Sequence, residues 1–428
     1  MRAVILADFA TPNGGAPKVA LESARALAQA GVAVTYVHAI GDERHPLLDH
    51  PRIERVGLGL SDVWDMPVAK AAAAGIWHRE AARRLAHTLA DLPPGHTVLH
   101  LHQWTRAFSP SAFPVLMRSG HPLAVTMHDY FLACPNGVYY RFDRTEPCRL
   151  TPLSPACLTA PCDPKSALHK AVRVVRTFAT RAAVRHGGFD VIHVSDRGRD
   201  TIAPFLPRGV RQHRVDNPVQ TAKAAPACIG EGSKIAYVGR LTREKGADLV
   251  ALAAREAGTP VMFIGEGPLE PELRALNPAA EFMGWRRPAD VDRLLREKAR
   301  AVAAPSRWFE TGPLTVYEAM AAGLPAIASV RAGAAEKVIA GNTGFVVEPT
   351  VAALAQAFAT LSDLSVARRM GQAAYATYWQ SPPTSEVHAA QLVAVYESML
   401  TAARAPAGLP AGKATRERAG APSRSTAA

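Results

Sequence analysis

Short apolar runs that lead into glycine-rich turns, and then into helical patterns, mark two parts of this chain. In the first part, the apolar run 3–7 is followed by a turn at 13–15 and by a helical pattern between Pro17 and Gly31. A second apolar run covers 32–37. Proline is favoured near the start of a helix and glycine just past its end. This order predicts a strand, a helix and a second strand, which together open a doubly wound parallel sheet.

The same order returns in the second half of the chain. The apolar run 235–238 meets a turn at 239–246, a helical pattern ends at Gly258, and the run 261–264 follows. A chain of 428 residues is also too long for a single hydrophobic core. We therefore predict an α/β protein with two Rossmann-like, doubly wound domains.

Three further strand-like segments, "HTVLHLH", "LAVTMH" and "VIHVS", end in histidine or serine. In open parallel sheets, ligands bind in the crevice outside the carboxyl ends of the strands. The crevice candidates are therefore His100, His102, His128 and Ser195. The alternative is that most of these side chains only cap their strands.

Composition suggests where the domains divide. The stretch 216–234 is polar and is broken by Pro218 and Pro226, which is typical of a linker. The end of the chain is rich in alanine, proline, glycine and serine, with almost no large apolar residue, and this composition predicts disorder. The predicted parts are an N-terminal domain over 1–220, a C-terminal domain over 221–380, a helix over 381–402 and a disordered tail over 403–428.

The formal net charge of +12 implies attraction to anions such as nucleotide phosphates, nucleic acid or an anionic membrane. The basic residues are scattered and no nucleic-acid-binding module is recognisable, so no nucleic-acid partner is expected. Within 165–187, apolar residues share one helical face and no carboxylate accompanies the cations, which would suit contact with an anionic leaflet. The alternative is an exposed, solvated helix. The apolar residues are Leu168, Val172, Val175 and Ala179, and the cations are Lys165, Lys170, Arg173, Arg176, Arg181 and Arg185.

No apolar run is long enough to span a membrane. Asp8 interrupts the first apolar stretch too early for a signal peptide, so we expect a cytoplasmic protein, and peripheral binding at the inner face of the membrane is compatible with this expectation. In that compartment, disulfides are not expected. Four of the five cysteines cluster without a C-x-x-C pair, and the sequence leaves open whether they bind a structural metal or are simply buried: Cys134, Cys148, Cys157 and Cys162.

The segment "VGRLTREKG" carries Arg240 and Lys245 in the turn after a predicted strand. A helix begins directly afterwards, and its positive dipole end faces the same edge of the sheet. At ~4 Å and an effective dielectric constant of ~20, one pair of unit charges contributes on the order of 4 kcal/mol. Two cations could therefore replace a divalent metal in stabilising a departing diphosphate. The alternative is two solvated surface cations.

The segment "FETGPLTVYEAMAAGLP" lies between two predicted buried strands and carries two glutamates. A helix is expected from Pro313 to about residue 322, with Gly323 just past its end. Glu310 precedes this helix, and Glu318 lies in its second turn. Paired sugar hydroxyls suit carboxylate acceptors, so these glutamates are candidates for binding a ribose and a second sugar ring.

We expect Gly312 to cap this helix, which leaves the amides of Leu314 and Thr315 free to bind phosphate. Pro313 has no N–H, so one potential phosphate donor is missing there.

These motifs, in this order, resemble those of the retaining glycosyltransferases of family four, which have the GT-B fold. The resemblance covers roughly residues 1–400 and rests on "GR-L-x-x-E-K-G", on E-x7-E with "EAMAAGLP", and on "HLHQW", "MHDYFLACP" and the N-terminal "GGAPKVALESARALAQAGVAVTYV". One departure is the order Thr311, Gly312, Pro313 after the first glutamate, where the common form has an aromatic residue and then glycine.

The resemblance implies roles for individual residues. Gly15 would approach the diphosphate or the acceptor through its backbone, and Arg240 and Lys245 would hold the donor diphosphate. His128 and Glu310 would contact the donor sugar at the reacting centre, and Glu318 would contact the ribose. The segment "FMGWRRP" would lodge the nucleotide base.

The resemblance also implies an N-terminal acceptor-side domain and a C-terminal domain that binds a nucleotide diphosphate sugar. The expected reaction moves the sugar to a hydroxyl of a glycan or lipid-linked acceptor, by a front-face mechanism that requires no metal and no other cofactor. Such a hexosyltransferase would serve bacterial-type glycan, polysaccharide or glycolipid assembly. Two alternatives remain: a nucleotide-sugar epimerase on the same fold, and a non-catalytic sugar-nucleotide-binding partner.

Overall fold

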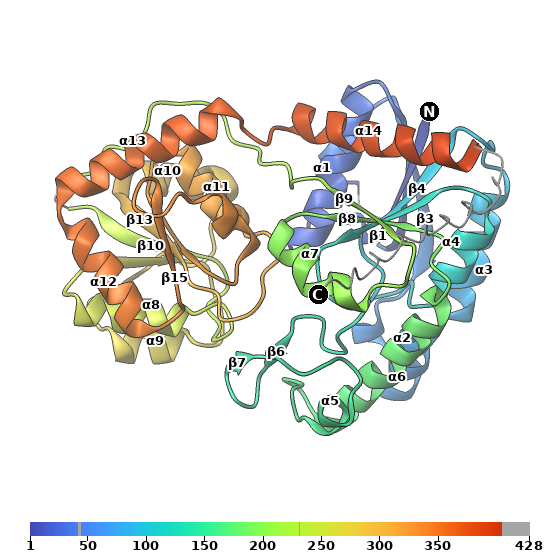
Figure 1. Ribbon diagram of the computed structural model, residues 1–428, viewed down its shortest axis with the longest axis horizontal. Helices are drawn as coiled ribbons and strands as arrows, with labels where there is room; N and C mark the ends of the chain where they lie inside the picture. Colours follow the sequence, from blue (N-terminus) through green and yellow to red (C-terminus); the bar gives the residue numbers. More distant parts are fainter. Residues whose placement is uncertain (42–43, 231, 405–428) are drawn as a thin grey trace, which may run out of the picture.

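The computed structural model describes residues 1–41, 44–230 and 232–404. Its polypeptide forms two α/β halves that lie side by side, each built on its own parallel sheet (Figure 1). The predicted tail falls almost entirely outside the described residues.

The N-terminal sheet has strand order β3-β2-β1-β4-β5-β8-β9, and every pairing in it is parallel. Successive side chains of β1 enter opposite cores, Ala3, Ile5 and Ala7 on one face and Val4 and Leu6 on the other, as strand geometry requires. The strands are β1 (Arg2–Phe9), β2 (Ala33–Ile40), β3 (Ile53–Leu60), β4 (Thr97–Leu101), β5 (Leu123–Met127), β8 (Asp190–His193) and β9 (Arg211–Arg214).

Helices cover both faces of this sheet (Figure 1). A small antiparallel pair, β6 (Tyr140–Arg141) and β7 (Glu146–Pro147), stands apart from it. The helices are α1 (Gly15–Gln29), α2 (Val68–Ile76), α3 (Arg79–Ala90), α4 (Ala112–Arg118), α5 (Pro155–Thr159), α6 (Ala167–Val184) and α7 (Asp196–Ile202), with 3-10 turns η1 (Pro46–Leu48), η2 (Val63–Asp65) and η3 (Ala203–Phe205).

The C-terminal sheet has strand order β12-β11-β10-β13-β14-β15 and is also parallel throughout. Its strands are β10 (Lys234–Val238), β11 (Val261–Ile264), β12 (Glu281–Phe282), β13 (Ala299–Ala304), β14 (Ala326–Ser329) and β15 (Gly344–Val347). Its helices are α8 (Ala247–Glu256), α9 (Glu270–Leu276), α10 (Pro288–Lys298), α11 (Leu314–Ala321), α12 (Val351–Ser362) and α13 (Leu364–Gln380), with the 3-10 turn η4 (Gly333–Lys337).

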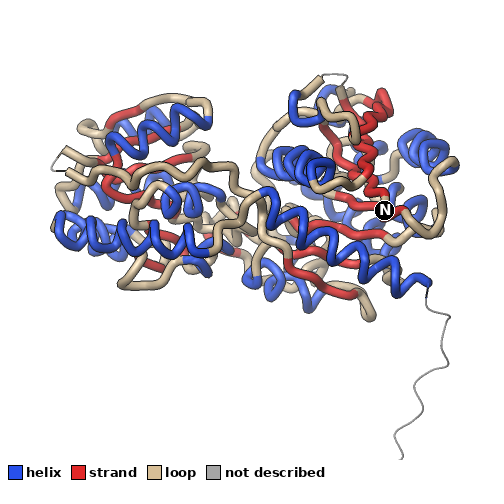
Figure 2. Tube along the Cα trace, turned by 90° about the horizontal axis from the view of Figure 1, so that it is seen from above, coloured by secondary structure: helices blue, strands red, loops and turns tan. Residues whose placement is uncertain are grey.

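The last helix, α14 (Ser385–Arg404), returns to the N-terminal half. It runs across that half as the long helix at its edge (Figure 2). Leu392, Tyr396 and Met399 join the same core as α1 and β1. Sequence predicted this helix but not the half on which it packs.

Helix α6 is oriented differently from the sequence expectation. Leu168 and Val175, from the predicted apolar face, are 65% and 49% exposed, whereas Lys170 and Arg176 are buried. Both interpretations from sequence, contact with an anionic leaflet and an exposed, solvated helix, place the cations at the surface, and both are wrong for Lys170 and Arg176. The pattern misled because a cavity, rather than a continuous apolar core, lies beneath the helix at Arg176.

The clustered cysteines carry no disulfide in the structure. Cys162 accepts a hydrogen bond from Lys170, and Cys134 donates one to Asn136. Within residues 1–41, 44–230 and 232–404, no group of His, Cys, Asp or Glu side chains is arranged to hold a metal ion. The same residues contain no helix that combines the length and the apolar character needed to cross a membrane.

Candidate active site

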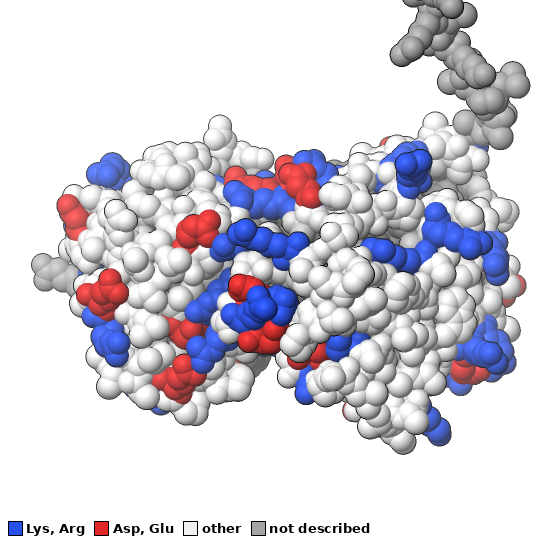
Figure 3. All heavy atoms as spheres, turned by 60° about the horizontal axis from the view of Figure 1, so that its bottom comes forward, with Lys and Arg blue, Asp and Glu red and all other residues white. Residues whose placement is uncertain are grey.

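A cleft of about 600 Å³ lies between the two halves, at the carboxyl ends of both sheets. Most of the residues singled out from sequence line it. Lys and Arg side chains, with several Asp and Glu, gather near this junction on the face shown in Figure 3. The predicted residues on the cleft are Gly15 and His128 from the N-terminal half and Arg240, Lys245, Glu310, Gly312 and Leu314 from the C-terminal half.

The first wall of the cleft is the start of α1. Gly14 caps this helix with φ of 100°, a backbone conformation that side chains with a Cβ rarely adopt. No atom stands within 4 Å of where a Cβ would lie on Gly15, so the backbone faces open space. The first amides of α1 are therefore accessible to an anion in the cleft.

The second wall is the loop from β10 to α8. Arg240 is well exposed and lies 4.0 Å from Glu244, while Lys245 is largely buried beside the ring of Trp308. The loop turns at Gly246, where a Cβ would stand only 2.4 Å from the carbonyl oxygen of Pro305. Glycine is thus required for the turn that places Lys245 at the cleft.

Glu310 is held from both of its carboxylate oxygens. Lys245 forms an ion pair with one oxygen, and the hydroxyl of Ser306 donates to the other. Burial, the largest effect, favours the protonated form, but the charge of Lys245 and the hydrogen bonds from Lys245 and Ser306 together lower the pKa of Glu310. The side chain is therefore a fixed, ionised acceptor for hydroxyl groups.

Helix α11 begins one residue later than predicted. Its cap is Pro313, with an extended ψ of 119°, and Leu314 is the first helical residue, so Gly312 is not the cap. A cap residue contributes its carbonyl and not its N–H to the helix. The proline at this position therefore removes none of the first helical amides, and Leu314 lines the cleft.

Thr315 and Glu318 do not line this cleft. Glu318 instead lies within electrostatic reach of Lys18 on α1. Burial, the largest effect, raises the pKa of its carboxyl, Asp292 adds to the rise, and Lys18 opposes it. Among the described residues, none donates a hydrogen bond to the Glu318 carboxylate.

His128 is the last member of a buried row of histidines. Its Nε2 lies 3.0 Å from Nδ1 of His102, whose ring centre is 4.1 Å from that of His100. His100 contacts the hydroxyls of Tyr396 and Thr126, each at 2.6 Å. Burial lowers the pKa of His128 to about 3, so it enters the cleft as a neutral imidazole.

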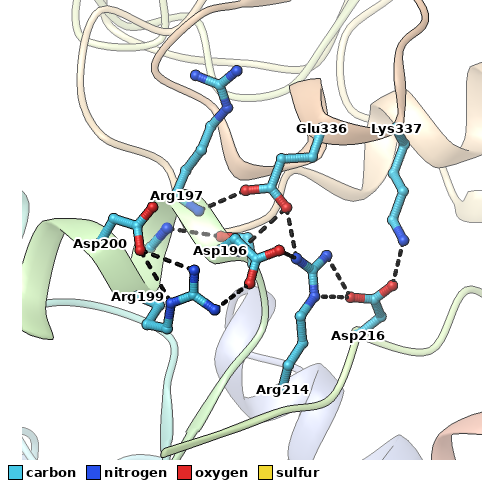
Figure 4. Close-up of polar contacts among 10 residues, drawn as sticks. Asp196, Arg197, Arg199, Asp200, Arg214, Asp216, Glu336 and Lys337 are labelled. Atoms are coloured by element: carbon cyan, nitrogen blue, oxygen red, sulfur yellow. Dashed lines mark hydrogen bonds and ion pairs between the residues drawn. The ribbon is translucent and has the colours of Figure 1, made fainter.

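Polar contacts join the two halves beside the cleft. The hydroxyl of Thr311 donates to the carbonyl oxygen of His128 at 3.0 Å, which ties the loop of Glu310 to the end of β5. Farther out, an ion cluster crosses the junction (Figure 4). Arg214 pairs with Glu336 at 2.8 Å, and Lys337 with Asp216 at 2.6 Å.

Sequence reasoning missed several residues of the cleft. Asp129 follows His128 directly, and burial raises the pKa of its carboxyl to about 6. Trp308 precedes Glu310 by two residues, and Asn217 lies in the linker with a buried, unpartnered amide oxygen. The strand-end rule that selected His128 would also have selected Asp129. No local signal pointed to Asn217, because a linker enters a site only through the tertiary arrangement.

Comparison with solved structures identifies the class of fold. HepE from Anabaena in complex with UDP superposes with a TM-score of 0.62 and 16% identity, over 93% of this chain and 100% of that one. Sucrose-phosphate synthase from Thermosynechococcus elongatus has a TM-score of 0.68 and 18% identity, over 94% and 99%. The fold is GT-B, with two Rossmann-like halves facing a central cleft.

Sequence comparison finds relatives of the C-terminal half. Residues 220–377 match the family model for glycosyl transferases group 1. Glycogen synthase from Mycobacterium tuberculosis is 36% identical over 156 residues, which is 33% of this chain and 37% of that protein. The chain thus spans little more than a third of the length of this curated relative, and the match supports a glycosyltransferase-type C-terminal half.

Proposed function

We propose that this protein is a retaining glycosyltransferase of family four, which moves a sugar from a nucleotide diphosphate sugar to a hydroxyl acceptor. The observation that carries the proposal is the convergence of His128, Glu310, Arg240 and Lys245 on one cleft between two GT-B halves. The group 1 match over residues 220–377 and the UDP bound by HepE support a nucleotide-sugar donor.

The donor diphosphate would lie between the two cations and the helix starts. Arg240 and Lys245 supply positive charge, and the first amides of α1 and α11, including those at Gly15 and Leu314, supply hydrogen-bond donors. These groups do the work of a divalent ion, so the proposed reaction needs no metal. Glu318 and Thr315 lie outside the cleft. Their proposed contacts, of Glu318 with the ribose and of Thr315 with a phosphate, would require that α1 and α11 enclose the donor.

The chemistry then follows from the protonation states. The acceptor oxygen forms a bond to the anomeric carbon as the bond from that carbon to the diphosphate breaks, on the same face of the sugar. The acceptor proton passes to the departing phosphate oxygen. Ionised Glu310 and neutral His128 hold hydroxyls of the donor sugar, and Lys245 and Arg240 neutralise the leaving group.

The acceptor is proposed to be a glycan or a lipid-linked glycan in bacterial-type polysaccharide or glycolipid assembly. A cytoplasmic location with peripheral contact to an anionic membrane is part of the same proposal. Its support is the apolar surface of α6, where Leu168 and Val175 are exposed, together with the exposed cations Lys165 and Arg185 just beyond the two ends of the helix.

The first experiment measures binding. A thermal-shift panel of nucleoside diphosphates should raise the melting temperature for one base in the wild-type protein. Lys245→Ala should abolish the rise, whereas Lys298→Ala, at the far end of α10, should keep it. No shift with any nucleoside diphosphate or its sugar would contradict the proposal.

The second experiment separates the proposed reaction from its alternatives. Mass analysis of products with and without acceptor should show a glycosylated acceptor and a free nucleoside diphosphate. An isomerised donor formed without acceptor would favour an epimerase. Tight donor binding without turnover of any acceptor tested would favour a non-catalytic partner.

A further inference from the structure

A second cavity, of about 490 Å³, lies in the N-terminal half between α2 and α6. These two helices lie side by side at the lower right of Figure 1. Its wall combines apolar side chains with three arginines and His169, and none of the described residues that line it is Asp or Glu. The apolar members include Trp64, Met66, Val68, Phe131, Leu168 and Val172.

The arginines of this cavity are incompletely paired. Arg106 pairs with Asp62, and Arg173 lies 3.2 Å from Asp163, but Nε of Arg173 has no hydrogen-bond partner among the residues that the structure describes. Arg176 is 9% exposed, forms no ion pair with any described residue, and has a buried Nη2 without a partner. Buried charges are normally paired, because desolvating a lone charge is costly.

The surroundings of Arg176 confirm that its charge is poorly compensated. Its guanidinium lies 4.5 Å from the ring centre of Phe131, and burial together with the charge of Arg173 lowers its pKa to about 10. Asp129, Asp8 and Asp163 attract it only at longer range. A buried cation that still has free donors suits an anionic ligand in the cavity.

The mouth of the cavity is apolar and open. Val68 is 73% exposed and Leu168 is 65% exposed, while Trp64 is partly exposed beneath the ammonium of Lys165. Exposed large apolar side chains around a cationic pocket match an amphiphile whose anionic group enters first. Inorganic phosphate alone would leave this apolar rim uncovered.

The cavity also adjoins the donor cleft. The ring of Phe131 lies against Gly137, where a Cβ would come within 2.5 Å of it, and Gly137 lines the cleft. Asp129 lines the cleft on one side and acts electrostatically on Arg176 on the other. A ligand held in the cavity thus lies just behind the wall of the reaction site.

From these contacts we infer that the α2–α6 cavity binds the phosphate of a lipid phosphate ester, with Arg173 and Arg176 holding the phosphate and the apolar rim holding the start of the chain. The identification of this ligand as the carrier of the sugar acceptor rests on the proposed function. The binding itself does not, because it needs neither a donor nor turnover.

The test is calorimetric titration of the protein with three probes: hexyl phosphate, inorganic phosphate and hexanol. The protein is first saturated with a nucleoside diphosphate, where one binds. Hexyl phosphate should bind, and both others should bind much more weakly. Arg176→Met should weaken hexyl phosphate about 10- to 100-fold, the usual effect of losing charge-assisted hydrogen bonds. The matched control, Arg185→Met, changes an exposed arginine just past the end of α6 and should bind like wild type.

A second variant distinguishes the loss of this binding site from a folding defect. Gly75 lines the cavity from α2, and no atom stands within 4 Å of its missing Cβ, so Gly75→Phe should fill the cavity without touching a charge. It should abolish hexyl phosphate binding while thermal shifts with the nucleoside diphosphate stay unchanged. The wild type should co-sediment with vesicles that contain phosphatidic acid to a greater extent than Gly75→Phe. Neither protein should co-sediment with phosphatidylcholine vesicles.

Equal affinity for hexyl phosphate and inorganic phosphate would overturn the lipid assignment. Undiminished binding in both Arg176→Met and Gly75→Phe would overturn the site. Absence of nucleotide binding in the wild type would instead contradict the proposed function. The affinity of the α2–α6 cavity for hexyl phosphate could still be measured in that case.

Discussion

Glu310 shows how much one side chain can decide in this cleft. Its two oxygens are already held by Lys245 and Ser306, so the carboxylate has a fixed direction before any sugar arrives. Preorganised groups of this kind stabilise a transition state without reorganising at the moment of reaction.

Replacing Glu310 by glutamine should therefore lower kcat/KM for sugar transfer by about 10²- to 10³-fold, the usual effect of losing one preorganised electrostatic contact. The amide also leaves Lys245 without its counter-charge. Steady-state kinetics of the purified variant would measure this loss, and circular dichroism would check the fold. Activity within a few-fold of wild type would rule out the role given to Glu310.

Glu22 on α1 is a buried carboxyl with one unpartnered oxygen. Burial is the main cause that raises its pKa to about 7, Lys18 opposes the rise, and Glu318 adds to it. The unfolded chain ionises this group near its ordinary pKa of 4.5. Between about pH 4.5 and 7, the folded state therefore binds more protons, and stability falls as the pH rises.

Glu22→Gln removes this penalty. The variant should be more stable than wild type at pH 8, by at most about 3 kcal/mol, and the two should converge below pH 4.5. Urea denaturation at pH 5, 7 and 8 would measure the difference. A gap that widened toward low pH would contradict the assignment.

At the scale of elements, local patterns placed most strands and helices within a residue or two. The run 261–264 is strand β11, and Gly258, just beyond α8, has the positive φ of 60° expected after a helix end. Such signals are local, because they reflect turn geometry and backbone sterics. The orientation of α6 was predicted wrongly. Its apolar residues do recur at helical spacing, but the side of the helix that carries Arg176 lines a cavity and not a continuous apolar core.

Helix α14 depends on a contact that no local pattern encodes. Tyr396 lies in the core of the N-terminal half, and its hydroxyl is 2.6 Å from Nδ1 of His100. That bond anchors the histidine row that ends at His128.

Tyr396→Phe keeps the ring but leaves one polar atom of His100 unpaired in the core. We expect a loss of about 1–3 kcal/mol in the free energy of unfolding, the usual cost of such an orphaned group. Chemical denaturation would measure it. The control is Tyr375→Phe, which removes a solvent-exposed hydrogen bond to the carbonyl oxygen of Ala224 and is expected to change little. No loss in Tyr396→Phe would mean that His100 finds another partner.

For the molecule as a whole, the position of one half on the other decides whether the cleft exists. Thr311 bonds to the backbone of His128, and Arg214 joins Asp216 of the linker to Glu336 of the C-terminal half (Figure 4). These contacts hold Glu310 and His128 at one site.

Arg214→Met should loosen this arrangement. Since the ion cluster is partly buried, we expect a loss of about 1–3 kcal/mol, together with a larger radius of gyration in solution scattering and a raised KM for the donor. Arg211→Met removes only a pair with Asp190 in the same half and is the matched control. Unchanged scattering and KM in Arg214→Met would show that the cluster does not set the orientation.

The sequence by itself determined the two parallel sheets and the strand ends that carry His128, Arg240, Lys245 and Glu310, because apolar periodicity, turn glycines and helix caps act over a few residues. The tertiary structure alone decided that α14 packs on the N-terminal half, that Glu318 lies near Lys18 and outside the cleft, and that Arg176 lines a cavity. The physical reason is that burial and charge pairing depend on which surfaces meet, and residues far apart in the chain decide that together.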